Sequence, residues 1–344
     1  MNKSTIICIG VLLSSGLKSQ DIHFSQFYTT PTLLNPSTAG ASQYDYRLAL
    51  NYRNQWNSII SPFKTAAVAF DSKFYIGKRT AKNKMDNHFG YGIYVFNDQS
   101  GISKLSTNQL NGSLAYHLYL KRSSSLSFGV QVGAYHKSIN ASGLKWDAQY
   151  NGKVYDASAS NQEPNISQSL IQFDLGVGMQ YRYINRYTGS AVRVGGSMMH
   201  ITKPSVSFND SKESLNYKYV GHISGEKKLN PHLFLQPSAM FLMQGNHSEI
   251  TFGSNVKFVL GDEHENVILS TYKKFSSAFQ AGVFYRNKDA VILTTGFEFN
   301  HRLLLGISYD INVSQLRKAS NLRGGIEFSL ILTNLRASKL HTKY

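Results

Sequence analysis

Residues 126–135 read LSFGVQVGAY, and their pattern is the clearest indication of the fold. Apolar residues alternate in it with small or polar ones, as Phe128 and Val130 do with Gly129 and Gln131. Successive residues of a β-strand point to opposite faces of the sheet. This period of two therefore predicts a strand with one apolar face and one small or polar face.

The same alternation recurs through most of the chain, for example at residues 171–183 (IQFDLGVGMQYRY) and 303–312 (LLLGISYDIN). A further apolar stretch, residues 267–273, would make the number of strands odd. Because bacterial single-chain barrels have an even number, we assign it to a loop. We predict strands near residues 45–53, 64–75, 88–98, 104–120, 125–139, 169–184, 191–201, 217–228, 233–244, 249–260, 277–287, 290–299, 303–312 and 324–332.

A soluble β-sandwich also alternates, and three features favour a membrane barrel instead. The polar faces carry charges and many glycines, which suits a hydrated lumen, and Tyr and Phe gather near strand ends, where aromatic girdles meet the lipid interfaces. Many of the predicted strands have about ten or more residues, whereas soluble strands usually have about five or six. We expect an all-β fold: a transmembrane antiparallel β-barrel of about 14 strands in the bacterial outer membrane.

Residues 1–19 have the pattern of a signal peptide. Lys3 supplies positive charge, and residues 6–13 form an apolar core that is too short to span a bilayer as a helix. Cleavage near Ser19/Gln20 would remove Cys8, the only cysteine, so we expect neither a disulfide nor thiol chemistry. The expected organisation is a signal peptide (1–19), an irregular N-terminal segment (20–44), the barrel (45–333) and a basic C-terminal tail (334–344).

The chain is basic, with a formal net charge of +16. Its Lys and Arg residues are scattered over the sequence without a long basic run, and an exported protein seldom meets nucleic acid. We therefore expect outer-membrane lipid, and no nucleic acid, as an electrostatic partner.

Patterns for catalysis or metal binding are weak. The eleven histidines are dispersed, without the His-x-x-x-His spacing of a metal-binding helix. The glycines of 176–178 and 195–196 lie within strand patterns that no helix follows, so we assign them to packing in the lumen and not to a phosphate loop. We expect a non-enzymatic protein with no cofactor and no metal.

Residues 20–44 do not follow the strand rhythm, because Pro31 and Pro36 remove backbone donors and constrain the residues before them. Such a segment could plug the lumen, cover the periplasmic mouth or contact a partner. From the residues alone we favour an ordinary lead-in to the barrel.

Charged residues on the polar faces of the predicted strands must be paired or hydrated once they are buried. We expect them to form a lumen network that braces the barrel or grips an inserted segment, in preference to a pore lining that sets ion selectivity. These residues are Asp174, Arg182, Arg286, Glu298, Asp310 and Glu327.

The N-terminal segment also carries a resemblance. The runs QDIHFSQF (20–27), LLNPSTAG (33–40) and RNQW (53–56) resemble the PorP/SprF family of the type IX secretion and gliding machinery. The likeness continues along the chain to GGIEFSL at 324–330. One departure is the basic tail (334–344), which stands in place of an aromatic strand end.

The resemblance implies a barrel that exports, receives or anchors large cargo proteins with a C-terminal secretion domain, beside other type IX secretion components. A general or substrate-specific porin is the alternative, and a purely structural barrel or surface adhesin is a third. The resemblance also implies a set of residues that bind a partner or form a plug. These residues are Phe24, Gln26, Asn35, Pro36, Arg53, Gln55 and Trp56.

Overall fold

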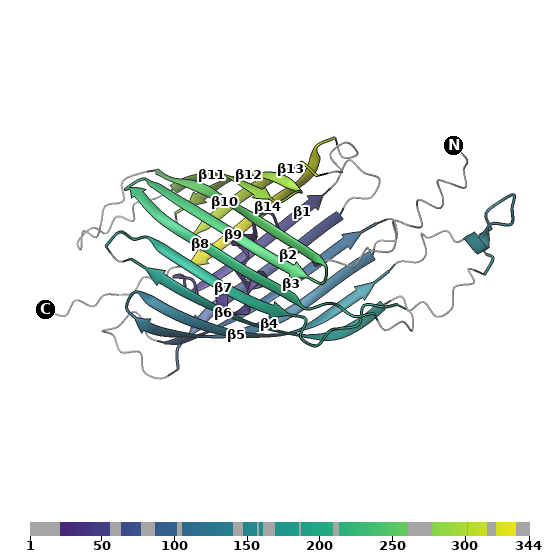
Figure 1. The fold of residues 1–344 in the computed structure, drawn as a ribbon, viewed down its shortest axis with the longest axis horizontal. Coiled ribbons are helices and arrows are strands. Elements are labelled where there is room, and N and C mark those ends of the chain that lie inside the picture. The colour runs from purple at the N-terminus through teal and green to yellow at the C-terminus, as the bar shows by residue number, and fades with distance from the viewer. Residues whose placement is uncertain are drawn as a thin grey trace.

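The computed structural model describes residues 21–55, 63–76, 87–101, 105–139, 147–156, 158–160, 169–185, 187–208, 213–260, 277–300, 302–314 and 321–334. In this part of the chain, fourteen antiparallel strands close into one barrel (Figure 1). The strands are β1 (Tyr46–Gln55), β2 (Phe63–Phe74), β3 (His88–Ser100), β4 (Leu105–Lys121), β5 (Ser124–Ser138), β6 (Ser169–Ile184), β7 (Ala191–Met199), β8 (Lys218–Asn230), β9 (Leu233–Gln244), β10 (His247–Leu260), β11 (Ser277–Arg286), β12 (Ala290–Phe299), β13 (Leu303–Asn312) and β14 (Arg323–Asn334).

Each strand pairs with the next one along the chain, and β14 closes the barrel against β1. This seam runs the full length of β1, from Tyr46 opposite Asn334 to Gln55 opposite Gly325. We call the end where β1 begins and β14 ends the proximal end, and the opposite end the distal end. The predicted barrel is confirmed, and no strand end differs from its predicted position by more than two residues. The stretch 267–273 lies outside the described residues.

The two faces of the wall have opposite polarity. On β5 the outward side chain of Val130 is 52% exposed, while the inward side chain of Gln131 is 1% exposed. A belt of exposed apolar side chains is stable only when lipid covers it, and the inner face then supplies the polar interior. On the outer face near the proximal end, Phe74 stacks on Phe89 at 5.5 Å and Phe89 lies 4.9 Å from Tyr116, as in an aromatic girdle.

Residues 21–44 lie inside the ring of strands (Figure 1, purple), and we call them the plug. Our favoured interpretation of this segment as an ordinary lead-in is therefore wrong. Two prolines and the absence of a strand pattern make it a series of single turns: η1 (Phe27–Thr29), α2 (Pro31–Leu34) and η2 (Pro36–Thr38). A further short 3-10 helix, η4 (Asp147–Gln149), lies in the connection between β5 and β6. Among the described residues, no helix is long and apolar enough to cross a membrane.

Candidate functional site

The first cluster of the site is a set of buried charges in the distal half of the lumen. Arg53 Nη2 and Arg286 Nη1 both donate to Asp310 Oδ2, at 2.9 and 3.1 Å. Arg53 Nη1 also lies 3.8 Å from Glu327 Oε2. None of these four side chains is more than 3% exposed. Removing one partner from such a group leaves an unpaired buried charge, which typically costs about 3–5 kcal/mol.

Ser25 of the plug completes this cluster. Its hydroxyl accepts from Arg53 Nη1 at 2.8 Å and from Arg286 Nη2 at 2.7 Å, and it donates to Asp310 Oδ1 at 2.7 Å. A hydroxyl has one donor and two acceptor positions, so all of them are used. The backbone N–H groups of Ser25 and Gln26 donate to the Glu327 carboxylate at 2.7 and 3.0 Å. The plug thereby joins β1 and β14 at the seam of the barrel to β11 and β13.

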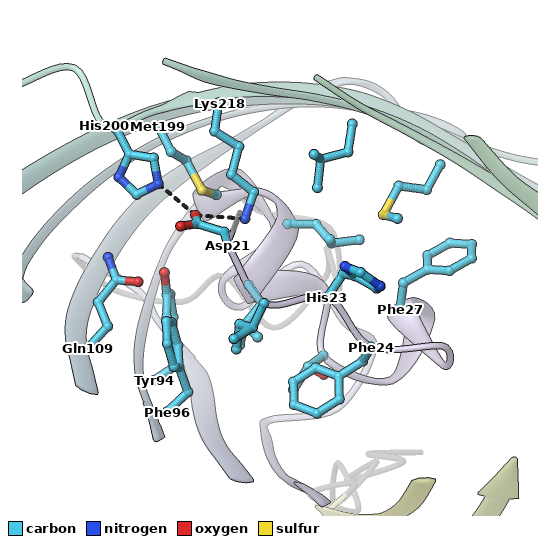
Figure 2. A pocket seen from close by; sticks show the side chains of 16 residues that line it. Asp21, His23, Phe24, Phe27, Tyr94, Phe96, Gln109, Met199, His200 and Lys218 are labelled. Atoms are coloured by element: carbon cyan, nitrogen blue, oxygen red, sulfur yellow. Dashed lines mark hydrogen bonds and ion pairs between the residues drawn. The ribbon is translucent and has the colours of Figure 1, made fainter. Parts of the chain in front are cut away.

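A second cluster, the latch, fixes the first described residue of the plug. Figure 2 shows Asp21 between His200 and Lys218, and its Oδ2 lies 2.6 Å from His200 Nε2 and 3.0 Å from Lys218 Nζ. The other ring nitrogen of His200 lies 2.8 Å from Asp174 Oδ2, and Gln109 Nε2 donates to the same oxygen at 3.1 Å. The latch thus ties Asp21 to strands β4, β6 and β8 and to the residue that follows β7.

The charges in the latch reinforce one another. Burial by itself lowers the pKa of His200, but the Asp21 and Asp174 carboxylates outweigh it and raise this pKa to about 9. Burial tends to raise the pKa of Asp21, whereas His200 and Lys218 hold it well below its usual range. At neutral pH the site therefore contains an imidazolium between two carboxylates, with both ring N–H groups donating.

Apolar contacts hold the plug between the two clusters. Phe27 packs on an inward-facing apolar patch of the wall, 6.1 Å from the ring of Phe284 and beside Met240. Phe24 packs on the opposite side, in a cluster that contains Tyr94 and Phe96. Burying one phenylalanine side chain contributes roughly 1.5–3 kcal/mol. The lumen is thus lined in part by apolar side chains that the plug covers.

A row of glycines on the wall receives the turn of the plug around Asn35. Asn35 is fully buried and donates through Nδ2 to the carbonyl oxygens of Met179 and Gly196, at 2.9 and 3.2 Å. A Cβ on Gly178 would lie 2.1 Å from Asn35 Oδ1, and one on Gly129 would lie 2.3 Å from the backbone nitrogen of Ser37. Only glycine allows the plug to approach the strands this closely.

Side chains of the wall hold the last part of the plug by hydrogen bonds to its backbone. His117 Nε2 donates to the Ala39 carbonyl at 2.8 Å, and Arg182 Nη1 donates to the Ala41 carbonyl at 3.2 Å. The Gly40 N–H donates to Asp71 Oδ2 at 2.9 Å. These bonds direct the chain toward the proximal end, where β1 begins.

The structure brings five of the seven signature residues to the contact between plug and wall: Phe24, Gln26, Asn35, Pro36 and Arg53. Gln55 ends β1 opposite Gly325 and makes no hydrogen bond to the plug within the described residues. Trp56 lies outside them.

The six predicted lumen charges do not form one network. Arg286, Asp310 and Glu327 belong to the cluster around Ser25, Asp174 belongs to the latch, and Arg182 binds the plug backbone. Glu298 pairs separately with Lys257 at 2.6 Å. The division follows from the register of the strands, which places these charges at different heights in the barrel.

Several residues of the site carry no signal of their own in the sequence. Ser25 and Asp21 both lie within the run 20–27 that carries the resemblance, but neither was singled out by its residue type. Asp21 would be the second residue after the expected cleavage site. His200 and Lys218 are separated by a long connection, so only the closed barrel brings them together. Nowhere in the described ranges do three or more His, Cys, Asp or Glu side chains meet as metal ligands.

Replacing Gly129 by alanine should displace the plug. The new Cβ would meet Ser37 at 2.3 Å, and overpacking of this kind costs about 1–3 kcal/mol. We expect faster cleavage of the plug by added protease and a lower midpoint for thermal loss of the folded gel band. Gly112→Ala is the matched control, since its Cβ would meet nothing closer than 4.0 Å. If the two variants have the same cleavage rate and the same thermal midpoint, the backbone of residues 35–37 does not pack against Gly129.

His200 should titrate near pH 9 in the folded protein. Its pKa lies above the ordinary value of 6.5, so its stabilising effect is complete below about pH 6.5 and is lost as the pH rises through about 9. Proton–nitrogen NMR of histidine-labelled protein measures this directly, with His200→Gln to assign the signal. Asp21→Asn should shift the titration toward neutral pH. A His200 signal that titrates at or below pH 7 in the wild type would contradict the pairing of His200 with Asp21 and Asp174.

Comparisons with solved structures find other barrels at low similarity. The toluene transporter TbuX of Ralstonia pickettii is 10% identical, with a TM-score of 0.49, over 88% of this chain and 92% of that one. A FadL homologue of Pseudomonas aeruginosa is 13% identical, with a TM-score of 0.46, over 87% and 92%. CdiB of Acinetobacter baumannii is 7% identical, with a TM-score of 0.42, over 84% and 60%. We base no argument on likenesses this distant, and no curated protein matches the sequence.

The comparison with protein families is specific. Residues 16–332, which include the plug and nearly the whole barrel, match the family described as type IX secretion system membrane protein PorP/SprF. The resemblance of the N-terminal runs is thereby confirmed over most of the chain. The chain belongs to the PorP/SprF family of type IX secretion system membrane proteins.

Proposed function

We propose that this protein is a non-enzymatic component of type IX secretion in the bacterial outer membrane. In this proposal it receives, exports or anchors a cargo protein with a C-terminal secretion domain at the cell surface. The family supports a role in secretion, and the belt of exposed apolar side chains supports insertion in a membrane. The proximal end, where β1 begins and β14 ends, faces the periplasm in this arrangement.

The proposal depends mainly on one observation, which is that the plug occupies the lumen. The plug is bonded to the wall at the latch, around Ser25, around Asn35 and at Ala41. A diffusion pore needs a continuous hydrated path, whereas this interior contains apolar contacts and charges that are already paired. A barrel with such a core presents its mouths and loops, and not its lumen, to other molecules.

A distal loop presents exposed apolar side chains that a partner protein could bind. The connection between β5 and β6 contains Tyr150, Val154 and Tyr155, all exposed, and Tyr150 forms a bridge with Tyr155. Exposed aromatic and aliphatic side chains on a loop are typical of protein-binding surfaces. In our proposal this end faces the cell exterior, where cargo would be received. The signature residues act by holding the plug that closes the barrel beneath it.

The test is to purify the tagged protein from its native outer membrane in mild detergent and to identify its companions by mass spectrometry. We expect a large exported protein with a C-terminal secretion domain or other secretion components. Deleting the exposed loop segment 150–155 should reduce the recovery of cargo at least several-fold while the barrel stays folded. A barrel that is repeatedly recovered alone would contradict the proposal.

The alternative, a general or substrate-specific porin, makes the opposite prediction in a planar bilayer. We expect the wild-type protein to show no stable conductance steps, because the plug lies across the lumen between the two mouths. Gly129→Ala, which should displace the plug, is expected to give intermittent steps. Uniform, long-lived steps from the wild type would favour the porin.

A further inference from the structure

A cavity of about 480 Å³ opens at the proximal end of the barrel. It lies between the last residues of the plug, from Ala41 to Tyr44, and the inner faces of strands from both halves of the barrel. Its wall includes Gln180, Arg193, Gln280, Arg302 and Thr333. The closed lumen described above ends here, so the plug forms the floor of a chamber that the proposed function does not use.

The charges of this chamber are not balanced. Arg193 lines the chamber, and Arg182, which is not a lining residue, donates to the carbonyl of the lining residue Ala41. The two arginines stand directly opposite each other on β7 and β6, both on the inner face. Like charges in register on neighbouring strands repel each other. Arg193 makes no hydrogen bond or ion pair within the described ranges, and the buried Nε of Arg182 has no hydrogen-bond partner there.

The acidic groups around the chamber offset only part of this positive charge. Glu298 pairs with Lys257 at 2.6 Å. Glu226 accepts a hydrogen bond from the neutral amide of Gln236 at 2.8 Å, so it keeps its charge, and this charge attracts both arginines. Asp71 pairs with Arg47 at 2.8 Å. Arg182 and Arg193 therefore share one carboxylate, Glu226, and an excess of positive charge remains, in contrast to the Ser25 cluster.

We propose that this chamber binds an acidic peptide segment that a partner protein presents from the periplasm. Guanidinium groups match carboxylates through paired N–H donors, which favours Glu and Asp side chains as the ligand. The amides of Gln180 and Gln280 and the hydroxyl of Thr333 can bond to a peptide backbone. The volume lies within the range of ligand pockets, about 300–1,000 Å³, and a single small anion would fill little of it.

The location also links this ligand to the plug. Arg182 holds the Ala41 carbonyl, and Lys73 Nζ donates to the Gln43 carbonyl at 3.1 Å. A bound peptide would therefore lie against the stretch of plug that these two side chains hold. This assignment rests on the proposed function in one respect only, which is that the proximal end faces the periplasm.

The experiment measures binding of fluorescein-labelled hexaglutamate to the purified full-length protein in nanodiscs by fluorescence anisotropy. Hexalysine is the control peptide. We expect hexaglutamate to bind, and Arg193→Gln and Arg182→Gln each to weaken binding at least tenfold. Arg193→Lys, which keeps the charge and loses the paired donors, should give an intermediate loss. Lys227→Gln is the matched control, because it removes one charge from an exposed site on β8 that also lies near the proximal end of the barrel.

Each other outcome overturns the assignment. Absence of binding, or an equal loss in Lys227→Gln and Arg193→Gln, would show only general attraction to a basic protein. Displacement of hexaglutamate by equimolar inorganic phosphate would assign the chamber to a small anion. The folded gel band before and after heating verifies that each variant is folded. Because no cargo is present, failure here leaves the co-purification test of the proposed function unaffected.

Discussion

The structure depends on the need to neutralise charges that the barrel wall places in its own interior. Arg53, Arg286, Asp310 and Glu327 are buried, and they surround the hydroxyl of Ser25. Without the plug, both guanidinium groups would lose an acceptor and the Glu327 carboxylate would lose two backbone donors. Such losses are expensive in a site of low polarity. The wall and the plug therefore require each other, and the plug is part of the folded core of the barrel.

The remaining contacts determine where the plug lies and how tightly it fits. The latch at Asp21 holds its first described residue, the glycines opposite Asn35 and Ser37 let its backbone approach the strands, and Arg182 holds its exit at Ala41. Because polar and apolar contacts alternate along it, the plug cannot shift lengthwise without losing several at once. An interior occupied by the plug leaves the two mouths as the surfaces for recognition. At the distal mouth the exposed loop carries aromatic side chains, and at the proximal mouth two facing arginines share a single carboxylate.

The strands could be predicted from the sequence because alternation is a local property, visible in runs such as 126–135. Closure then follows because unpaired sheet edges are not tolerated in lipid. The plug could not be predicted in the same way. Ser25 and Asp310 are 285 residues apart, and nothing in either local sequence reveals their contact. The grouping of the lumen charges needed the register of the strands, which places Asp174 near His200 and Glu298 near Lys257. The signature residues pointed to the right segment, but the resemblance, and not the residue chemistry, identified them.

The most direct test of a plug held by buried charges is hydrogen exchange at the amides of Ser25 and Gln26 in the membrane-embedded protein. These amides donate to the Glu327 side chain and belong to no strand, so their exchange reports on the plug alone. If the account is right, they exchange about as slowly as the amides of the neighbouring strands β13 and β14, and Glu327→Gln accelerates them. If they exchange as fast as the exposed turn at Tyr187 between β6 and β7, the plug is not a fixed part of the barrel.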